Sequence, residues 1–391
     1  MRILFLTSNY PTPARPVHGT FVQQFVWVMA RQGNECVVIR PVSLWERRYG
    51  PLPEFLSEED AGDGAKVKVY YPRYLSFSSK DLKWTHTGHW TQWAFNLAVW
   101  KLVRQMEFRP DIVYGHFLYP GGYAAIQMGK RLNVPSVVRV GESSFWTISP
   151  FGIDRASRHY QKVAGIIANG THLKDSLVSR LGIGEKKIIV VPNGVDVSRF
   201  RPCNRNEARK ILSLPMSEFL VSFVGANIER KGSYRVLEAV QELNGVKCIF
   251  AGVGTEEIDS DLLLLKGPRP HEEIPLFFSA ADIFVLPTLS EGSCNAIIEA
   301  MACGLPIVTA KGEHMDDIVD DSVAIRLDPT DVEAIRSAIL KLKNNPDLRQ
   351  RMSKACLEKA KEFDINQRAR RVTEWMTRLV EHYRDSSSRE P

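Results

Sequence analysis

Short apolar runs alternate with segments of helical periodicity along most of the chain, which predicts parallel strands joined by helices. Strands are expected at residues 3–7, 35–40, 110–116, 134–140, 166–168, 187–192, 219–224, 263–267, 282–287 and 305–309. Helices are expected at residues 20–33, 84–104, 122–132, 171–181, 233–243, 295–303, 331–342, 347–363 and 367–383. This alternation is typical of the α/β class and of doubly wound domains, and 391 residues suffice for two of them. Residues 41–83 show no clear period.

Several helix boundaries carry sequence signals. Thr20 and Gln23 predict a capping box at the start of the first helix, and Thr171 is expected to cap a later one. Gly33 and Gly304 mark expected helix ends.

The most informative stretch is 285–308, where a strand, a polar turn, a helix and another strand follow one another within 24 residues. The turn holds Glu291, Gly292 and Ser293. Such a turn lies at the carboxyl edge of a parallel sheet, and the N–H groups of the following helix favour a phosphate there.

Glu291 precedes this helix and Glu299 lies within its second turn, so both carboxylates can reach one ligand. Ionised carboxylates accept several hydrogen bonds, which suits the hydroxyl groups of a sugar and a ribose. The alternative is that both are solvated charges near a helix end, the usual place for glutamate.

The run from Ser290 to Val308 resembles the E-x7-E motif of the retaining glycosyltransferases of family 4. The resemblance implies that Glu291 contacts the donor sugar and Glu299 the nucleotide ribose. It also implies the GT-B fold, in which two facing Rossmann-like domains enclose the active site and a C-terminal helix crosses back to the first. The expected boundaries are 1–190 for the acceptor-side domain, 191–365 for the nucleotide-sugar domain and 366–391 for the returning helix.

The turn from Gly225 to Gly232 resembles the family's G-R-L-x-x-x-K-G motif, and Asn193-Gly-Val-Asp196 resembles its crossover between domains. Lys231 matches, Ala226 stands where the motif has arginine, and Arg230 is a candidate replacement for that charge. Cations beside a helix start can stabilise a diphosphate leaving group. The full donor-binding set expected from the resemblance is Gly225, Arg230, Lys231, Glu291, Gly292, Ser293, Cys294, Asn295 and Glu299.

Three residues of the first half are candidates for the acceptor side. Gly19 ends the first loop, where glycine permits a close ligand approach or simply a turn. His116 ends a strand and matches the second histidine of the family's PD-x-V-H-x-H pattern, whereas Tyr114 replaces the first. Glu142 is a candidate substitute for the family's aspartate, whose place Ser143 takes. His116, Glu291 and Lys231 form the expected catalytic set.

No metal or other cofactor is expected. Asp259-Ser-Asp261 precedes an apolar strand rather than ending one, and Gly252-Val-Gly254 lacks the third glycine of a dinucleotide-binding loop. The resemblance implies transfer of a sugar from a nucleoside diphosphate to a hydroxyl acceptor with retention at the anomeric carbon.

Charge and aromatic content concern possible partners. Residues 1–190 carry 24 Lys+Arg against 14 Asp+Glu, and 191–391 carry 27 against 31. With no nucleic-acid motif, the basic half indicates an anionic substrate or membrane face. The segment from Trp84 to Arg104 is either a core-facing helix or one that docks on lipid. We therefore expect a saccharide or lipid-linked saccharide acceptor, as in bacterial cell-surface polysaccharide assembly.

The six cysteines are scattered without a C-x-x-C pair, which favours reduced thiols and a cytoplasmic protein, peripheral at the inner membrane face if it docks there. Two other functions fit parts of the pattern. One is a GT-B sugar-nucleotide epimerase, and the other is a non-catalytic nucleotide-sugar-binding subunit, which Ala226 and Ser143 would favour.

Overall fold

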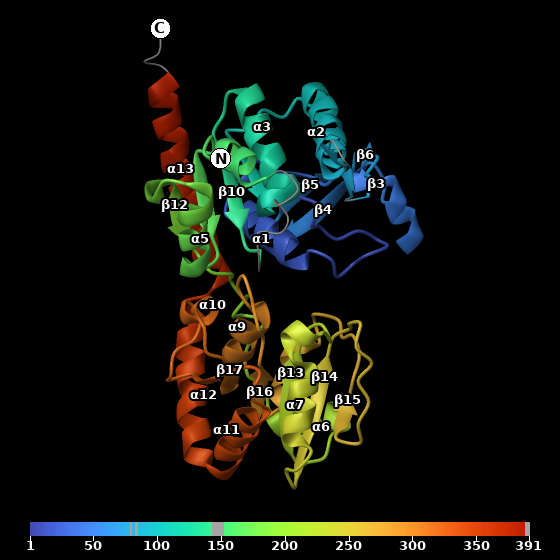
Figure 1. The fold of residues 1–391 in the computed structure, drawn as a ribbon, viewed down its shortest axis with the longest axis vertical. Helices are drawn as coiled ribbons and strands as arrows, with labels where there is room; N and C mark the ends of the chain where they lie inside the picture. Colours follow the sequence, from blue (N-terminus) through green and yellow to red (C-terminus); the bar gives the residue numbers. More distant parts are fainter. Residues whose placement is uncertain (79, 83–84, 143–151, 388–391) are drawn as a thin grey trace. The chain divides into compact units, whose positions relative to one another are not determined.

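The computed structural model describes residues 1–78, 80–82, 85–142 and 152–387. The chain divides into two compact units (Figure 1). Unit 1 contains residues 1–191 and 368–391, and unit 2 contains residues 192–367. Each unit is built around its own sheet, which is mainly parallel in unit 1 and fully parallel in unit 2.

The main sheet of unit 1 has eight strands in the order β12-β11-β10-β9-β1-β2-β5-β4. All neighbours pair in parallel except β4 and β5, which are antiparallel. The strands are β1 (Arg2–Leu6), β2 (Glu35–Ile39), β4 (Leu56–Gly62), β5 (Ala65–Tyr70), β9 (Ile112–His116), β10 (Ser136–Val140), β11 (Gly165–Ala168) and β12 (Ile188–Val190). Short pairs form beside it from β3 (Val42–Ser43) with β6 (Arg73–Tyr74) and β7 (Asp81–Leu82) with β8 (Thr85–His86).

The helices of unit 1 cover both faces of this sheet. They are α1 (Thr20–Arg31), α2 (Gly88–Gln105), α3 (Tyr123–Leu132), α4 (Ile153–Tyr160) and α5 (Thr171–Leu181), with shorter turns at Leu44–Tyr49, Phe117–Gly122 and Glu185–Lys187. Leu4 and Leu6 of β1 pack with Phe95 and Val99 of α2, whereas the ring of Phe5 lies 4.9 Å from that of Tyr114 on the opposite face. Successive side chains of a strand point to opposite faces, so one strand supplies both cores.

The last helix, α13 (Ile365–Ser387), completes unit 1 from residue 368 onward. Trp375 and Leu379 lie so close to Gly165 of β11 that a Cβ atom there would overlap the indole ring. Arg368 is buried with its guanidinium 4.3 Å from the ring of Phe25, and Arg384 pairs with Asp111 at 2.8 Å. Helix and sheet of unit 1 are therefore joined by both apolar and charged contacts.

Most expected elements are confirmed within a few residues, but two capping predictions are wrong. Gly19, in the left-handed conformation, caps α1, and Thr20 is already helical; Gly170 rather than Thr171 caps α5. In both places a glycine occupies the capping position without a side-chain hydrogen bond. Residues 41–83, for which no period was found, contain the antiparallel β4–β5 hairpin. The segment expected from Trp84 forms α2 from residue 88, and Trp84 itself lies outside the described residues.

Unit 2 contains a six-stranded parallel sheet in the order β15-β14-β13-β16-β17-β18. Its strands are β13 (Phe219–Val224), β14 (Val246–Ala251), β15 (Leu263–Leu265), β16 (Ile283–Leu286), β17 (Ile307–Ala310) and β18 (Ala324–Leu327). Its helices are α6 (Arg205–Ile211), α7 (Ser233–Val240), α8 (Ile274–Ala280), α9 (Asn295–Ala302), α10 (Glu313–Asp316), α11 (Val332–Asn344) and α12 (Pro346–Lys361), with a turn at Glu229–Lys231. Of these, α6, α8 and α10 were not expected.

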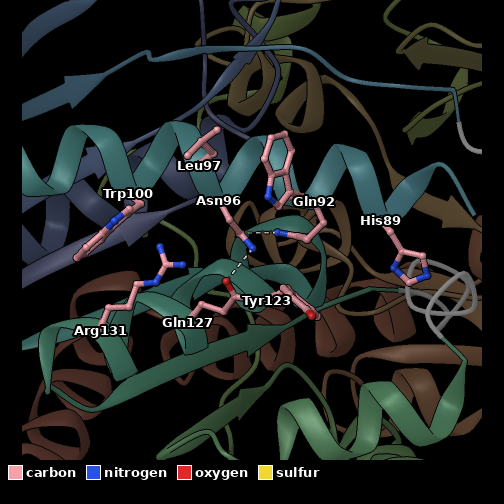
Figure 2. A pocket seen from close by; sticks show the side chains of 9 residues that line it. His89, Gln92, Asn96, Leu97, Trp100, Tyr123, Gln127 and Arg131 are labelled. Atoms are coloured by element: carbon pink, nitrogen blue, oxygen red, sulfur yellow. Dashed lines mark hydrogen bonds between the residues drawn. The ribbon is translucent and has the colours of Figure 1, made fainter.

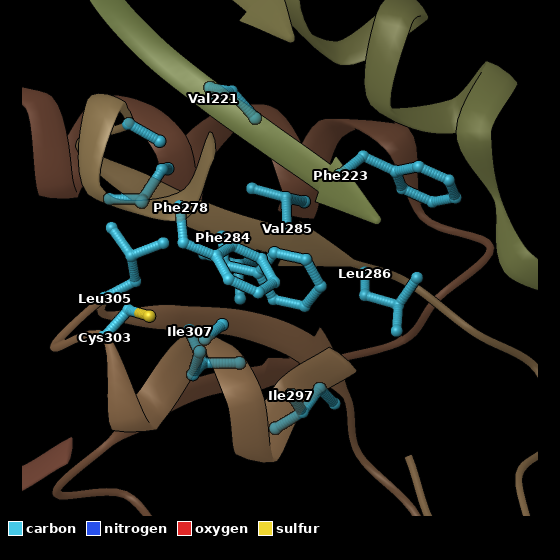
Figure 3. Packing of buried hydrophobic residues seen from close by; sticks show 14 of the residues in the cluster. Val221, Phe223, Phe278, Phe284, Val285, Leu286, Ile297, Cys303, Leu305 and Ile307 are labelled. Atoms are coloured by element: carbon cyan, nitrogen blue, oxygen red, sulfur yellow. The ribbon is translucent and has the colours of Figure 1, made fainter. Parts of the chain in front are cut away.

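One large apolar core holds unit 2 together, and Figure 3 shows its centre around β16. Phe278 of α8 packs edge-on against Phe284 with ring centroids 5.5 Å apart, while Leu305 and Ile307 lie beside them. Every side chain of β16 is fully buried, as expected for an apolar strand inside a parallel sheet. This packing fixes the end of β16, from which the Glu291 turn departs.

No helix in the described part of the chain is long and apolar enough to span a membrane.

Candidate active site

Most of the expected donor-binding residues lie in two loops at the carboxyl edge of the unit 2 sheet, and the other two, Asn295 and Glu299, lie on α9. Strand order reverses between the neighbouring strands β13 and β16, and parallel sheets bind ligands outside such a point. Residues 225–232 follow β13, and residues 287–295 follow β16. The fold thus brings Lys231 beside Glu291 although 60 positions separate them.

Glu291 is the centre of this cluster, and its side chain is 10% exposed. Its Oε1 atom accepts hydrogen bonds from Lys231 Nζ, from Thr288 Oγ1 at 2.9 Å and from Arg230 at 3.3 Å. Arg230 also donates to the carbonyl oxygen of Ser290. Both expected cations therefore reach the same carboxylate, which confines three charged side chains to one small site. Thr288 was not expected there, and it carried no sequence signal beyond its place after β16.

Glu299, on α9, makes a separate contact. Its Oε1 atom lies 3.0 Å from Nε2 of His271, whose ring is 5.2 Å from that of Phe200. The turn containing His271 follows β15, so strands at both sides of β13 contribute to this edge of the sheet. Glu299 and His271 are 28 residues apart, and sequence reasoning did not pair them.

The start of α9 is fixed by Asn193 from the crossover segment. Its backbone N–H donates to Ser293 Oγ at 3.1 Å, and its side-chain amide donates to the carbonyl oxygen of Ser293 and to Asn295 Oδ1. The Cys294 side chain is buried, and burial raises the pKa of its thiol to about 11. At neutral pH the Cys294 thiol is therefore uncharged and contributes to packing at the start of α9. Gly292, which precedes Ser293 in the same turn, is also buried.

Close backbone packing explains two glycines at this edge of the sheet, Gly232 in the turn after β13 and Gly252 in the turn after β14. Gly232 has φ +79°, and a Cβ there would lie 2.7 Å from the carbonyl oxygen of Pro287. A Cβ on Gly252 would overlap the carbonyl oxygen of Gly225. Only glycine lets these loops approach one another, which places Lys231 against the turn that carries Glu291.

In unit 1 the strand order reverses between β1 and β9, and His116 ends β9. Its Nε2 atom lies 2.8 Å from the Arg139 guanidinium, which can only donate, so Nε2 accepts and Nδ1 carries the proton. Burial, aided by Arg139 and Arg368, holds the pKa of His116 well below its usual range. The imidazole is thus neutral at pH 7, and its Nδ1 has no hydrogen-bond partner in the part of the chain described.

The other two acceptor-side candidates also lie at this edge of unit 1. Gly19 has φ +81°, and a Cβ there would overlap the backbone of Asn9 in the loop after β1. Glu142, just beyond β10, accepts backbone hydrogen bonds from Leu118 and, at 2.9 Å, from Gly141. Glu142 therefore holds the turn after His116, and Ser143 lies outside the described residues.

Burial raises the pKa of Glu142 to about 7, despite the backbone N–H groups that donate to it. Because this folded-state pKa exceeds the unfolded value of about 4.3, the folded protein binds the proton more tightly. That stabilisation is complete below about pH 4 and is lost as the pH rises to about 7. We therefore expect the unfolding temperature of the wild type, relative to Glu142→Gln, to fall between about pH 5 and 7 and then level off. Parallel curves in a pH series of thermal melts would contradict this.

A basic pocket of about 270 Å³ adjoins the loop after β1. Arg15, His18, Arg40 and Arg48 line it together with Glu46. Arg40 is almost fully buried and pairs with Glu46 at 2.8 Å, while Arg48 lies over the ring of Tyr49. The pocket holds more cationic than anionic side chains, which suits an anionic group on a ligand.

Residues of the kinds that bind metals do not gather in a cluster of three anywhere in the described ranges. Asp259, part of the D-x-D sequence, is exposed and pairs with Lys266 at 2.7 Å. All six cysteines are free, and only Cys203 is exposed.

Two family models match consecutive parts of the chain. "Glycosyltransferase Family 4" matches residues 18–199, and "Glycosyl transferases group 1" matches residues 204–359. The chain belongs to the family 4 glycosyltransferases. TuaC of Bacillus subtilis, a glycosyltransferase assigned to teichuronic acid biosynthesis, is 26% identical over 352 residues, which cover 87% of this chain and 88% of TuaC.

Solved structures confirm that this glycosyltransferase has the GT-B fold. Sucrose-phosphate synthase from Thermosynechococcus elongatus matches with a TM-score of 0.78 at 16% identity, covering 98% of this chain and all of that one. HepE of Anabaena in complex with UDP-glucose matches with a TM-score of 0.71 at 16% identity, covering 96% and 99%.

Proposed function

We propose that this glycosyltransferase moves a sugar from a nucleoside-diphosphate sugar to an acceptor hydroxyl, with retention at the anomeric carbon and without a metal ion. The observation that carries the proposal is the meeting of Lys231, Arg230 and Glu291 at the switch point of unit 2, beside the start of α9. Cations and a helix N-terminus at one place suit a diphosphate, and a carboxylate next to them suits sugar hydroxyls.

Each residue then has a distinct role. Lys231, Arg230 and the N–H groups of Gly292 to Asn295 stabilise the charge that develops on the departing diphosphate. Glu291 orients the sugar hydroxyls and Glu299 the ribose, with Gly225 giving room for the nucleotide. His116, neutral and with the Nδ1 proton, serves as a hydrogen-bond donor for the sugar or acceptor. Because Lys231 contacts Glu291, binding of a donor exchanges this contact for contacts with phosphate and hydroxyl groups.

The proposed acceptor is an anionic saccharide, carried on lipid, in the assembly of a cell-surface polysaccharide. Two observations support it: the basic pocket beside Gly19 in unit 1, and the similarity to TuaC over most of both chains. Glu142 acts on the acceptor side by fixing the turn after His116. Peripheral contact with an anionic membrane surface from the cytoplasm would place the enzyme where such acceptors lie.

Thermal unfolding in the presence of UDP-, GDP-, ADP- and dTDP-sugars tests donor binding. With EDTA present, one nucleotide class is expected to raise the unfolding temperature, because a ligand that binds only the folded state stabilises it by mass action. At a ligand concentration of about 100 Kd the gain is about 2.7 kcal/mol. A shift that appears only after Mg²⁺ is added would contradict metal-free binding, and no shift in either condition would contradict the donor site.

Product analysis separates transfer from its rivals. Incubation with the stabilising donor and a saccharide acceptor should give a retained glycosidic linkage, detected by NMR of the anomeric proton. An altered nucleotide sugar formed without acceptor would instead show an epimerase, and binding without turnover would show a non-catalytic subunit.

A further inference from the structure

A groove on unit 1 lies between α2 and α3, outside the residues assigned to donor binding. It has a volume of about 270 Å³. The side chains that line it come from both helices (Figure 2). Its lining residues form two rows on α2 and one row on α3, and within each row they are four residues apart, which places them along one side of a helix. They are His89, Gln92, Trp93, Asn96, Leu97 and Trp100 of α2, and Tyr123, Gln127 and Arg131 of α3. We refer to this set as the α2–α3 groove.

Three amide side chains form a continuous ladder across the groove (Figure 2). Gln92 Nε2 donates to Asn96 Oδ1 at 2.9 Å, and Asn96 Nδ2 donates to Gln127 Oε1 at 3.1 Å. The ladder fixes the direction of every amide in it, so the hydrogen-bonding groups presented to the groove are set before any ligand arrives. Such preorganisation lowers the entropy lost on binding.

One end of the ladder is unsatisfied. Gln92 is 2% exposed and lines the groove, yet its Oε1 atom has no hydrogen-bond partner within the described ranges. Buried polar atoms are seldom left unpaired, so an unpaired acceptor on a residue that lines a groove points to a ligand that donates to it. A hydroxyl group can do so.

Aromatic rings complete the groove. Trp93 is 66% exposed, and Trp100 is covered on one side by the Arg131 guanidinium, 4.8 Å from the ring centroid. Amides beside aromatic faces suit a ligand with hydroxyl groups on its edge and C–H groups on its faces, which describes a pyranose ring. The volume lies just below the range of about 300–1,000 Å³ for drug-sized ligands, so one ring fits.

We propose that the α2–α3 groove binds one sugar ring of a saccharide. Gln92 Nε2 also donates to the carbonyl oxygen of Pro120 at 3.2 Å, in the turn that follows His116. The groove is thereby tied to the carboxyl edge of the sheet, where the acceptor is expected. That the ring belongs to the acceptor rests on the proposed function; that the groove binds sugar does not.

Arg131 adds a preference among sugars. Its side chain is exposed at the far end of the groove, where a guanidinium can donate two hydrogen bonds to a carboxylate. The groove therefore favours a ring that carries a carboxylate over a neutral ring of the same shape.

The test is saturation-transfer NMR on the full-length protein without donor, with methyl β-D-glucuronide and methyl β-D-glucoside as probes. We expect transfer to both probes and tighter binding of the glucuronide. Trp93→Ala should weaken binding of both by about tenfold, as expected for loss of an aromatic contact. Arg131→Ala should remove the preference for the glucuronide. Trp90→Ala is the matched control, because Trp90 lies on the same helix, 5.7 Å from Phe77, and does not line the groove.

Transfer to neither probe, or unchanged binding in Trp93→Ala, would overturn the proposal. So would a Trp93→Ala protein that keeps its sugar binding and loses co-sedimentation with anionic vesicles, since the groove would then be a lipid site. Sugar binding together with no response to any nucleotide sugar would overturn the proposed function and leave this site standing.

Discussion

Replacing Lys231 by alanine is expected to lower kcat by about 10²–10³, the usual effect of removing one group that stabilises developing charge. Lys231 Nζ contacts the buried Glu291 carboxylate, so the ammonium group is held at the start of α9 rather than free in solvent. The variant lacks the cation that is proposed to stabilise the negative charge on the departing diphosphate. Initial-rate measurements with the donor identified by thermal unfolding would give kcat and KM separately.

Two control variants show whether the lower kcat comes from the loss of the cation at position 231. Lys266→Ala removes an exposed lysine of the same unit that pairs with Asp259, and it should leave kcat unchanged. Lys231→Arg keeps the charge and should recover part of the rate. A Lys231→Ala protein that folds and turns over at the wild-type rate would end the assignment of Lys231 to the leaving group.

Replacing Asp282 by alanine is expected to reduce the free energy of unfolding of unit 2 by about 3–5 kcal/mol. Asp282 precedes β16 and is 6% exposed. Its carboxylate accepts from Arg209 at 2.8 Å, from Arg205 at 2.9 Å and from the backbone N–H of Leu220 at 2.7 Å. Alanine leaves the buried Arg209 guanidinium without its counter-charge, which costs far more than the loss of an exposed ion pair.

Hydrogen exchange reports on this effect separately for each unit. Amides of β13 should exchange faster in Asp282→Ala by the factor that corresponds to the lost free energy, whereas amides of β1 should not change. Asp259→Ala removes an exposed aspartate with little packing and should leave the free energy of unfolding almost unchanged. A loss for Asp282→Ala no larger than that of Asp259→Ala would show that Arg209 is satisfied by its carbonyl partners alone.

The sequence predicted most of the strand–turn–helix segment that carries Glu291 and Glu299, because local signals agree there. The apolar run of β16, the polar turn and the helical spacing of α9 occupy consecutive residues, so no distant contact is needed to recognise them. The motif match added the expectation that Lys231 and Glu291 act together, and the parallel sheet does bring them into contact.

Contacts between distant segments were the part that could not be predicted. The pairing of Glu299 with His271 depends on where β15 lies beside β14. The hydrogen bond that Glu142 accepts from the turn after His116 depends on the β9–β10 register. The β4–β5 hairpin was missed because β4 carries only one buried residue, Ala61, and so lacks an apolar pattern. Asp63-Gly64 at its turn was the available signal.

The docking of α13 has a consequence for biosynthesis. Unit 1 needs residues from 368 onward to cover β11 and to seat Arg368 beneath Phe25, but these leave the ribosome after all of unit 2. Domains generally fold as units during synthesis, and exposed apolar surface makes incomplete ones prone to aggregate. Unit 2 is therefore able to fold first. The residues of unit 1, although synthesised earlier, keep an apolar face exposed until the residues from 368 onward have been made. In stalled or truncated chains that lack α13, the exposed apolar surface of unit 1 should therefore need chaperones to prevent aggregation.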